Sequence, residues 1–320
     1  MTAGQPSTFV AGSTAEAGRK GRRRARDGRA AVLFLSPWLL GLVLLIGLPI
    51  LMMIAVSFTD WSLTSTPRFV GLDNYARMLS DHRFSQSISV TIRYVVLSVP
   101  LFMLTGLGLA LLLNTKIAGI GVFRTVLFVP SILAGVAVAV LWLQILSPET
   151  GLLNQMLRAL GVPNPPRWLT NPDWAVPAVV LTGIWTIGGG AIIYLAGLQN
   201  IPPHLYEAAE LDGADMVARF RHITIPMLSP TLFFVLITTL IGAFQVFDVA
   251  FVLGGSRGGG GNLLFYLLNL WNEGFRNGRY GYASALAVVF VACAAVVVIV
   301  AMRLSERLVY YEGDDRGGAG

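Results

Sequence analysis

Residues 205–230, with the sequence LYEAAELDGADMVARFRHITIPMLSP, form the only long polar and charged segment between two strongly apolar stretches. The dipeptide 202–203 is Pro-Pro, which suits the first turn of a helix because proline has a fixed φ and no N–H. A short helical pattern then runs to Leu211, Gly213 ends it, and a second helical pattern begins at Ala214. The stretch therefore predicts a helix, a tight glycine turn and a second helix, lying across a membrane surface.

The second helical pattern has one apolar face and a polar remainder. The apolar residues are Met216, Val217, Phe220 and Ile223, and the polar ones are Arg219, Arg221 and His222. Pro226 is expected to end this helix, because proline has no N–H to donate and its ring clashes with the preceding turn. Pro230 is then expected to open the next apolar span.

The stretch resembles the EAA loop of the membrane-spanning subunits of carbohydrate-uptake ABC importers. The residues that carry the resemblance are Glu207, Ala208, Ala209, Asp212, Gly213, Ala214, Phe220, Ile225 and Pro226. In that family the loop holds the coupling helix, which sits in a groove of a cytoplasmic ATPase subunit and transmits its closure to the transmembrane helices. The resemblance implies that Glu207 and Asp212 cap or contact that groove and that Gly213 supplies the turn. An ordinary amphipathic helix at the membrane interface is the alternative interpretation.

Three further segments resemble the same family, that of the inner-membrane components of binding-protein-dependent transport systems. Residues 69–75, FVGLDNY, are similar to its FxGLxNY segment, and residues 123–125, FRT, are similar to the start of its third helix. The glycine-rich run 254–261 is similar to the family's GGP turn, with Ser256 where the family often has proline. The resemblance covers about residues 30–305 and is to maltose- and glycerol-phosphate-permease-like chains.

The composition places the chain in a lipid bilayer. It has 320 residues, of which 55% are hydrophobic and 12% charged, which is too apolar for a typical soluble domain. Apolar runs able to cross roughly 30 Å of hydrocarbon are expected at about 31–58, 90–113, 122–146, 175–198, 231–253 and 283–302. They predict an all-α polytopic membrane protein with six transmembrane helices. The EAA loop then joins the fourth and fifth helices.

Residues 31–305 are expected to form the transmembrane domain, between two tails. The tail 1–30 is expected to be disordered, and its basic residues gather just before the first apolar run. They are Arg19, Lys20, Arg22, Arg23, Arg24, Arg26 and Arg29. By the positive-inside rule this predicts a cytoplasmic N-terminus, and six spans then place the tail 306–320 in the cytoplasm too. No aromatic residues interleave with the basic ones, so nucleic acid is not an expected partner.

The chain is not expected to be an enzyme. The glycine run 254–261 lacks the lysine that a phosphate-binding loop needs, and no strand precedes it. The histidines His82, His204 and His222 are scattered without the spacing of a metal site. We therefore expect no cofactor or metal in this chain. The resemblance implies that ATP and Mg²⁺ are bound by a partner ATPase.

Two apolar spans carry polar and aromatic residues that are candidates for the substrate path. Such groups inside a membrane face a cavity or another helix. The candidates are Thr239, Phe244, Gln245 and Asp248 in the fifth span and Trp185, Thr186 and Gly189 in the fourth. Gln245 and Asp248 are three residues apart, which predicts that they share one helix face. Asp248 could instead be only an interhelical hydrogen-bond partner. The glycine run 188–190 suggests the close approach of another backbone or a ligand.

These features together predict a permease subunit of a carbohydrate ABC importer that works by alternating access. The resemblance implies four kinds of partner: a second permease subunit, usually a different chain, a cytoplasmic ATPase dimer, an extracytoplasmic sugar-binding protein and the lipid of a prokaryotic cytoplasmic membrane. A secondary transporter or channel, and an ABC permease for another solute, are the alternatives. The fourth and fifth spans contain no basic residue, which favours a neutral sugar, although which sugar is left open.

Overall fold

The computed structural model describes residues 34–115, 117–133, 135–255 and 257–305. All its regular elements in these ranges are helices, and pairing between extended segments is limited there to two isolated bridges. The prediction of an all-α polytopic membrane protein is confirmed, because several of these helices are long and apolar enough to cross a membrane.

The described chain forms two compact units, one ending at Val56 and the other beginning at Ser57. The first unit is one apolar helix that continues to Ser57, in which a π-helical stretch η1 (Leu42–Gly47) leads into α2 (Leu48–Ser57). Most of its side chains are exposed and apolar, as hydrocarbon-facing side chains must be. The tail 1–30, with the basic residues that predict the orientation, lies outside the described residues, as does the tail 306–320.

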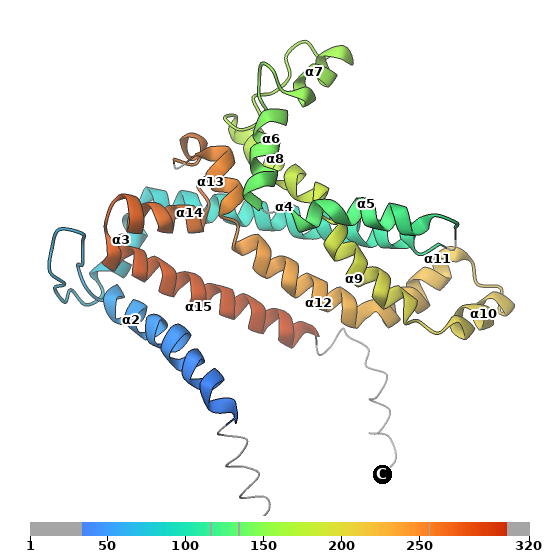
Figure 1. The fold of residues 1–320 in the computed structure, drawn as a ribbon, viewed down its shortest axis with the longest axis horizontal. Helices are drawn as coiled ribbons and strands as arrows, with labels where there is room; N and C mark the ends of the chain where they lie inside the picture. Colours follow the sequence, from blue (N-terminus) through green and yellow to red (C-terminus); the bar gives the residue numbers. More distant parts are fainter. Residues whose placement is uncertain (1–33, 116, 134, 256, 306–320) are drawn as a thin grey trace, which may run out of the picture. The chain divides into compact units, whose positions relative to one another are not determined.

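The second unit holds the remaining helices (Figure 1). In chain order they are α3 (Asp73–Ser80), α4 (His82–Leu113), α5 (Ile120–Ile132), α6 (Gly135–Ile145), α7 (Leu152–Ala159), α8 (Pro172–Trp185), α9 (Gly188–Gln199), α10 (Pro203–Leu211), α11 (Met216–Arg219), η2 (Phe220–Thr224), α12 (Ile225–Phe244), α13 (Asp248–Gly254), η3 (Gly259–Gly261), α14 (Tyr266–Trp271), η4 (Asn272–Arg276) and α15 (Tyr280–Ser305).

Four helical stretches qualify as membrane spans on their own, at 34–57, 82–113, 216–244 and 280–303. Two further pairs, α5 with α6 and α8 with α9, are long and apolar enough to cross a membrane only when each pair is counted as one span. The two helices of each pair are bent by more than 40° relative to each other. The described residues therefore hold between four and six spans, and six agrees with the expected number. The predicted third and fourth spans correspond to these two bent pairs.

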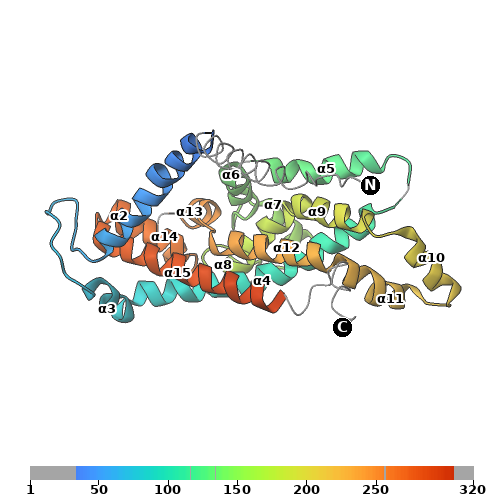
Figure 2. The same cartoon turned by 90° about the horizontal axis from the view of Figure 1, so that it is seen from below.

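Helix α4 is the central element of the second unit. It packs against α8, α9 and α12 (Figure 2). Its buried side chains belong to two apolar clusters. It starts at His82, eight residues before the expected span at 90–113, because Asp81 caps it by accepting the backbone N–H of Arg83 at 2.8 Å. Helix α9 crosses α5 closely at Gly188, where a Cβ would collide with the carbonyl of Leu127. The close backbone approach expected of the glycine run is therefore present.

The expectation that Pro226 ends a helix is wrong. Helical structure is continuous from Met216 to Phe244, so the fifth apolar span begins well before the expected residue 231. The π-helical stretch η2 explains why, because the N–H of Ile225 bonds to the carbonyl of Phe220, five residues back. Pro226 then stands in the first turn of α12, where its missing N–H costs little.

The fifth span also does not reach residue 253 as one helix. It breaks after Phe244, at Gln245, and the backbone of Phe247 (φ −134°, ψ −61°) is not helical. The prediction that Gln245 and Asp248 share one helix face is therefore wrong, because Gln245 caps the end of α12 whereas Asp248 begins α13. Helical spacing applies only within an unbroken helix.

Candidate functional site

Three helical segments break at points that face one cavity. The breaks fall between the helix ends Ile132 and Gly135, Trp185 and Gly188, and Phe244 and Asp248. A break leaves backbone N–H and C=O groups without helical partners, and a membrane tolerates such groups only inside protein or beside a water-filled cavity. In many transporters the binding site lies at broken helices for this reason.

The cavity has a volume of about 420 Å³, which suits a small organic molecule. Each break contributes to its wall. The lining residues beside the breaks are Leu133 and Gly135, Thr186 and Ile187, and Val246 and Val249. Movement at any of the three breaks would therefore change the shape of the same cavity.

The polar side chains of the cavity wall all end in hydroxyl groups. They are Tyr94, Ser131, Thr182, Thr186, Tyr194 and Thr239, and among the described residues no charged side chain lines the cavity. The hydroxyls of Ser131, Thr182 and Thr186 donate to backbone carbonyls at 2.7, 2.7 and 3.0 Å, which leaves their oxygens free to accept. The Tyr194 hydroxyl is buried and has no partner within the described residues. This lining can bond a neutral, hydroxyl-rich solute.

Four of the seven predicted path residues lie in or next to the cavity. Thr186 and Thr239 line it directly. Gly189 lies behind the lining residue Ser131, since a Cβ at Gly189 would be 3.4 Å from that side chain. Asp248 lies behind Gly135 in the same way, with its Oδ2 3.6 Å from where a Cβ of Gly135 would be.

The other three predicted path residues do not line this cavity. Trp185 contacts Trp142 edge to face, with ring centroids 6.3 Å apart. Phe244 and Gln245 line a separate small hollow against α15. Trp185 and Phe244 are the last residues of α8 and α12, and Gln245 follows at the break.

Sequence reasoning missed most of the hydroxyl lining, namely Tyr94, Ser131, Thr182 and Tyr194. The signal was present, because each is a polar group inside an otherwise apolar run and such groups turn away from lipid. Serine and threonine are nevertheless common in apolar helices, where they bond to the preceding turn. Only the packing of several helices around one cavity separates the lining hydroxyls from the rest.

Residues 205–230, which we call the coupling segment, fold as a helix, a turn and a helix. They lie at one end of the bundle, opposite α3 and α14 (Figure 1). Gly213 has φ +77°, a left-handed value that glycine adopts without strain, and the N–H of Ala214 bonds to the carbonyl of Ala209 at 2.9 Å. Asp215 then caps α11 by accepting the N–H of Ala218 at 2.6 Å. The sequence between the two helices therefore determines a sharp turn in the direction of the chain.

The coupling segment divides its apolar side chains between two surroundings. Phe220 and Ile223 pack against a buried cluster of the bundle. Leu211, Met216 and Val217 are 89%, 80% and 70% exposed at the tip. The predicted apolar face is therefore packed only at Phe220 and Ile223, because Met216 and Val217 begin α11 at the exposed tip.

The predicted coupling residues lie along the same segment. Glu207, Ala208, Asp212 and Gly213 are exposed, whereas Ala209, Ala214, Phe220, Ile225 and Pro226 are half-buried. The hydroxyls of Tyr206 and Thr224 bond at 2.9 Å, which ties α10 to the start of the long helix. An ion pair of 3.3 Å between Arg219 and the exposed Glu210 adds a second link. Both contacts link α10 to the continuous helix that includes α12.

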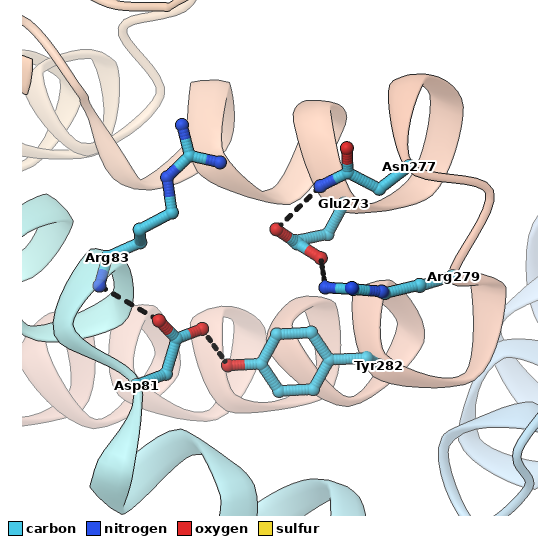
Figure 3. Close-up of polar contacts among 6 residues, drawn as sticks. All are labelled: Asp81, Arg83, Glu273, Asn277, Arg279 and Tyr282. Carbon is cyan, nitrogen blue, oxygen red and sulfur yellow. Dashed lines mark hydrogen bonds and ion pairs between the residues drawn. The ribbon is translucent and has the colours of Figure 1, made fainter. Parts of the chain in front are cut away.

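The opposite end of the bundle carries a polar network (Figure 3). Glu273 is 3% exposed, and its carboxylate accepts from the Asn277 amide at 2.9 Å and from the Arg279 guanidinium at 3.1 Å. Tyr282 on α15 donates to Asp81 at 2.7 Å, the same aspartate that caps α4. Asp81 and Tyr282 join the starts of α4 and α15, and Glu273 of η4 separately holds Asn277 and Arg279.

Comparison with known proteins identifies the family. Residues 75–310 match the model of the "Binding-protein-dependent transport system inner membrane component" family. The chain belongs to this family. It is therefore a multi-pass inner-membrane component of a transport system, and the predicted family is confirmed. The EAA segment is characteristic of the family.

Individual relatives are similar over almost their whole length. The "Probable ABC transporter permease protein YesP" of Bacillus subtilis (strain 168) is 36% identical, over 96% of this chain and 100% of its own. The "Trehalose/maltose transport system permease protein MalF" of Thermococcus litoralis is also 36% identical, over 88% of this chain and 95% of its own. Among solved structures, a bacterial alginate ABC transporter in complex with an alginate pentasaccharide-bound periplasmic protein matches with a TM-score of 0.79. It is 25% identical, over 90% of this chain and 97% of that chain.

Proposed function

We propose that this chain is the permease subunit of an ATP-driven importer that takes up a carbohydrate delivered by an extracytoplasmic binding protein. A separate ATPase supplies the energy, and the segment 205–230 couples its closure to the membrane helices. A second permease subunit completes the pathway. Both termini and the coupling segment then lie on the cytoplasmic side, and α3 and α14 lie outside.

The observation that carries the proposal is the exposed apolar tip of the coupling segment. Leu211, Met216 and Val217 are side chains that a water-facing loop would bury, and their exposure marks a surface for a partner. The same segment is anchored to α12 by Tyr206 and Thr224 and packs into the bundle through Phe220. A partner that binds the tip can thus move α12. This helix ends at one of the three breaks around the cavity.

The cavity supports a neutral sugar as the solute. Its wall offers hydroxyl groups and apolar surface, which match the hydroxyls and C–H faces of a carbohydrate. An anionic solute would favour a basic side chain there. The names of some relatives fit this chemistry, namely the trehalose/maltose, arabinooligosaccharide and lactose permeases, whereas a sulfoquinovosyl glycerol permease and the alginate importer are named for acidic solutes.

The test is ATP-dependent sugar uptake in vesicles that hold this chain with its candidate partner permease, ATPase and binding protein. Glu207→Arg reverses a charge on the exposed side of α10, and Gly213→Pro forbids the φ of +77°. We expect each variant to insert normally but to lose at least about tenfold in uptake and in stimulated ATPase activity, because a coupling loss of roughly 1.4 kcal/mol already gives a tenfold change.

A matched control is Arg158→Glu on α7, which reverses an exposed charge far from the coupling segment and should leave uptake near wild type. Uptake that persists without ATP, or coupling variants that behave as wild type, would replace the proposal with a secondary transporter or channel.

A further inference from the structure

Four aromatic side chains form a continuous strip at the end of the bundle opposite the coupling segment. They are Phe247 and Phe251 of α13, Trp271 of α14 and Phe275 of η4. Trp271 is the centre of the strip, with ring centroids 5.1 Å from Phe251, 6.2 Å from Phe247 and 6.2 Å from Phe275. Two pairs, Phe247 with Phe251 and Trp271 with Phe275, are stacked. We call these four residues the aromatic strip.

The aromatic strip runs from the surface of the protein towards the cavity. Phe275 is 74% exposed, and the other three rings are half-buried. At the inner end, Phe247 lies between Val246 and Val249, both of which line the cavity. At the outer end, Phe275 belongs to the same short π-helical stretch as Glu273 of the polar network. The strip therefore connects the outer surface with the break between α12 and α13.

Core packing accounts for Phe247 and Phe251, which pack against a buried apolar cluster. Neither core packing nor lipid anchoring accounts for the outer end of the strip. Phe275 exposes most of its surface and belongs to none of the buried apolar clusters among the described residues. Membrane-interface belts use tryptophan and tyrosine because these rings carry a polar end, which Phe275 lacks. Polar groups also flank the inner end, since Gln245 and Asp248 are both exposed beside Phe247.

Aromatic rings next to polar side chains match the surface of a sugar ring. A pyranoside presents axial C–H groups on its faces and hydroxyl groups around its edge. The negative face of an aromatic ring attracts the slightly positive C–H groups, and side-chain amides and carboxylates bond the hydroxyls. Successive rings at about one sugar-ring spacing let a pyranoside move from one to the next without losing contact.

We propose that the aromatic strip is a stacking surface on which the sugar passes from the outer mouth to the cavity. This inference rests on the proposed function, and it adds a substrate-contact site that lies outside the cavity. Because stacking uses the C–H face that pyranosides share, the strip accepts pyranosides broadly and contributes to access rather than to the identity of the sugar.

The first test is saturation-transfer NMR on the importer complex in nanodiscs of deuterated lipid, with methyl β-D-glucopyranoside as the probe and no binding protein present. Saturation of aromatic protons should reach the axial protons of the probe in the wild type. We expect Phe275→Ala and Trp271→Ala to lower that signal about threefold, because each removes an aromatic contact of modest strength. Phe275→Tyr should restore it, and the open-chain polyol sorbitol should give little signal.

Leu79→Ala is the matched control, because Leu79 is 90% exposed on α3 near the same end but outside the strip. An unchanged signal in both strip variants, or an equal loss in the control, would overturn the inference.

Uptake kinetics provide the second test and separate the two proposals. In vesicles with the complete importer, Phe275→Ala should raise KM about fivefold and leave kcat within twofold. The affinity of the binding protein for the permease should not change. A fall in that affinity with an unchanged NMR signal would instead make the strip a protein-docking surface. Loss of the proposed function would appear differently, as a wild-type importer without ATP-driven uptake.

Discussion

Two neighbouring threonines on α12 show how the cavity depends on single residues. Thr239 lines the cavity. Thr238 is exposed, and its hydroxyl already donates to the carbonyls of Phe234 and Val235 at 3.0 and 3.1 Å. Both residues are threonines of the same helix, and they differ only in the direction in which the side chain points. They therefore form an internal control for the role of the cavity hydroxyls.

We expect Thr239→Val to raise the KM for sugar uptake about threefold to tenfold, because it removes one hydrogen bond of roughly 0.5–1.5 kcal/mol without changing side-chain volume. Thr238→Val should change KM less than twofold. Initial rates of ATP-driven uptake by the complete importer measure both. Equal effects of the two substitutions would show that the cavity hydroxyls do not contact the sugar.

At the scale of elements, two π-helical stretches each precede a proline. The stretch η1 ends two residues before Pro49, and η2 ends two residues before Pro226. A π-turn bonds five residues back and widens the helix, which lets the chain continue past a residue that cannot donate. This explains why proline, a reliable end signal in soluble helices, did not end the helix here.

The crossing of α5 and α9 gives a prediction for helix packing. Gly188→Ala should lower the free energy of unfolding by about 1–3 kcal/mol, because its Cβ would collide with the backbone carbonyl of Leu127 and the helices would have to separate. Gly190→Ala is the control, since a Cβ there meets nothing within 4 Å and alanine favours the helix. Thermal unfolding in detergent measures both. Equal melting temperatures would contradict the close crossing.

At the scale of the whole molecule, the two ends of the bundle hold acidic residues in opposite surroundings. Glu273 is 3% exposed at the end with the aromatic strip and accepts two hydrogen bonds, whereas the side chain of Glu210 is 74% exposed at the end with the coupling segment. Burial decides how much each residue contributes to the stability of the fold. When one member of a buried polar group is removed, the others stay buried without a partner. An exposed ion pair is screened by water.

Glu273→Ala should therefore destabilise the fold by about 1–3 kcal/mol, since it leaves the Asn277 amide and the half-exposed Arg279 without their acceptor. Glu210→Ala should cost less than about 0.5 kcal/mol. Hydrogen–deuterium exchange should show faster exchange in η4 and the first turns of α15 only for Glu273→Ala. Comparable exchange in both variants would contradict a structural role for the network.

The sequence predicted the membrane class and the family because both depend on local patterns. Apolar length identifies a span wherever it occurs, and a segment such as EAA followed by Gly213 determines its own turn through backbone preferences. The candidate coupling residues could be named for the same reason. Of the predicted path residues, Thr186 and Thr239 line the cavity. The lining residues Tyr94 and Tyr194 were not predicted.

What the sequence by itself determined is how much of the chain lies in the membrane and where it reverses direction. The tertiary structure decided where the helices break, which hydroxyls meet in one cavity, and that Met216 is exposed while Phe220 is packed. The physical reason is that a nearly uniform apolar helix has no preferred face of its own. In lipid, only the close fit of neighbouring helices and the need to satisfy freed backbone groups select one arrangement.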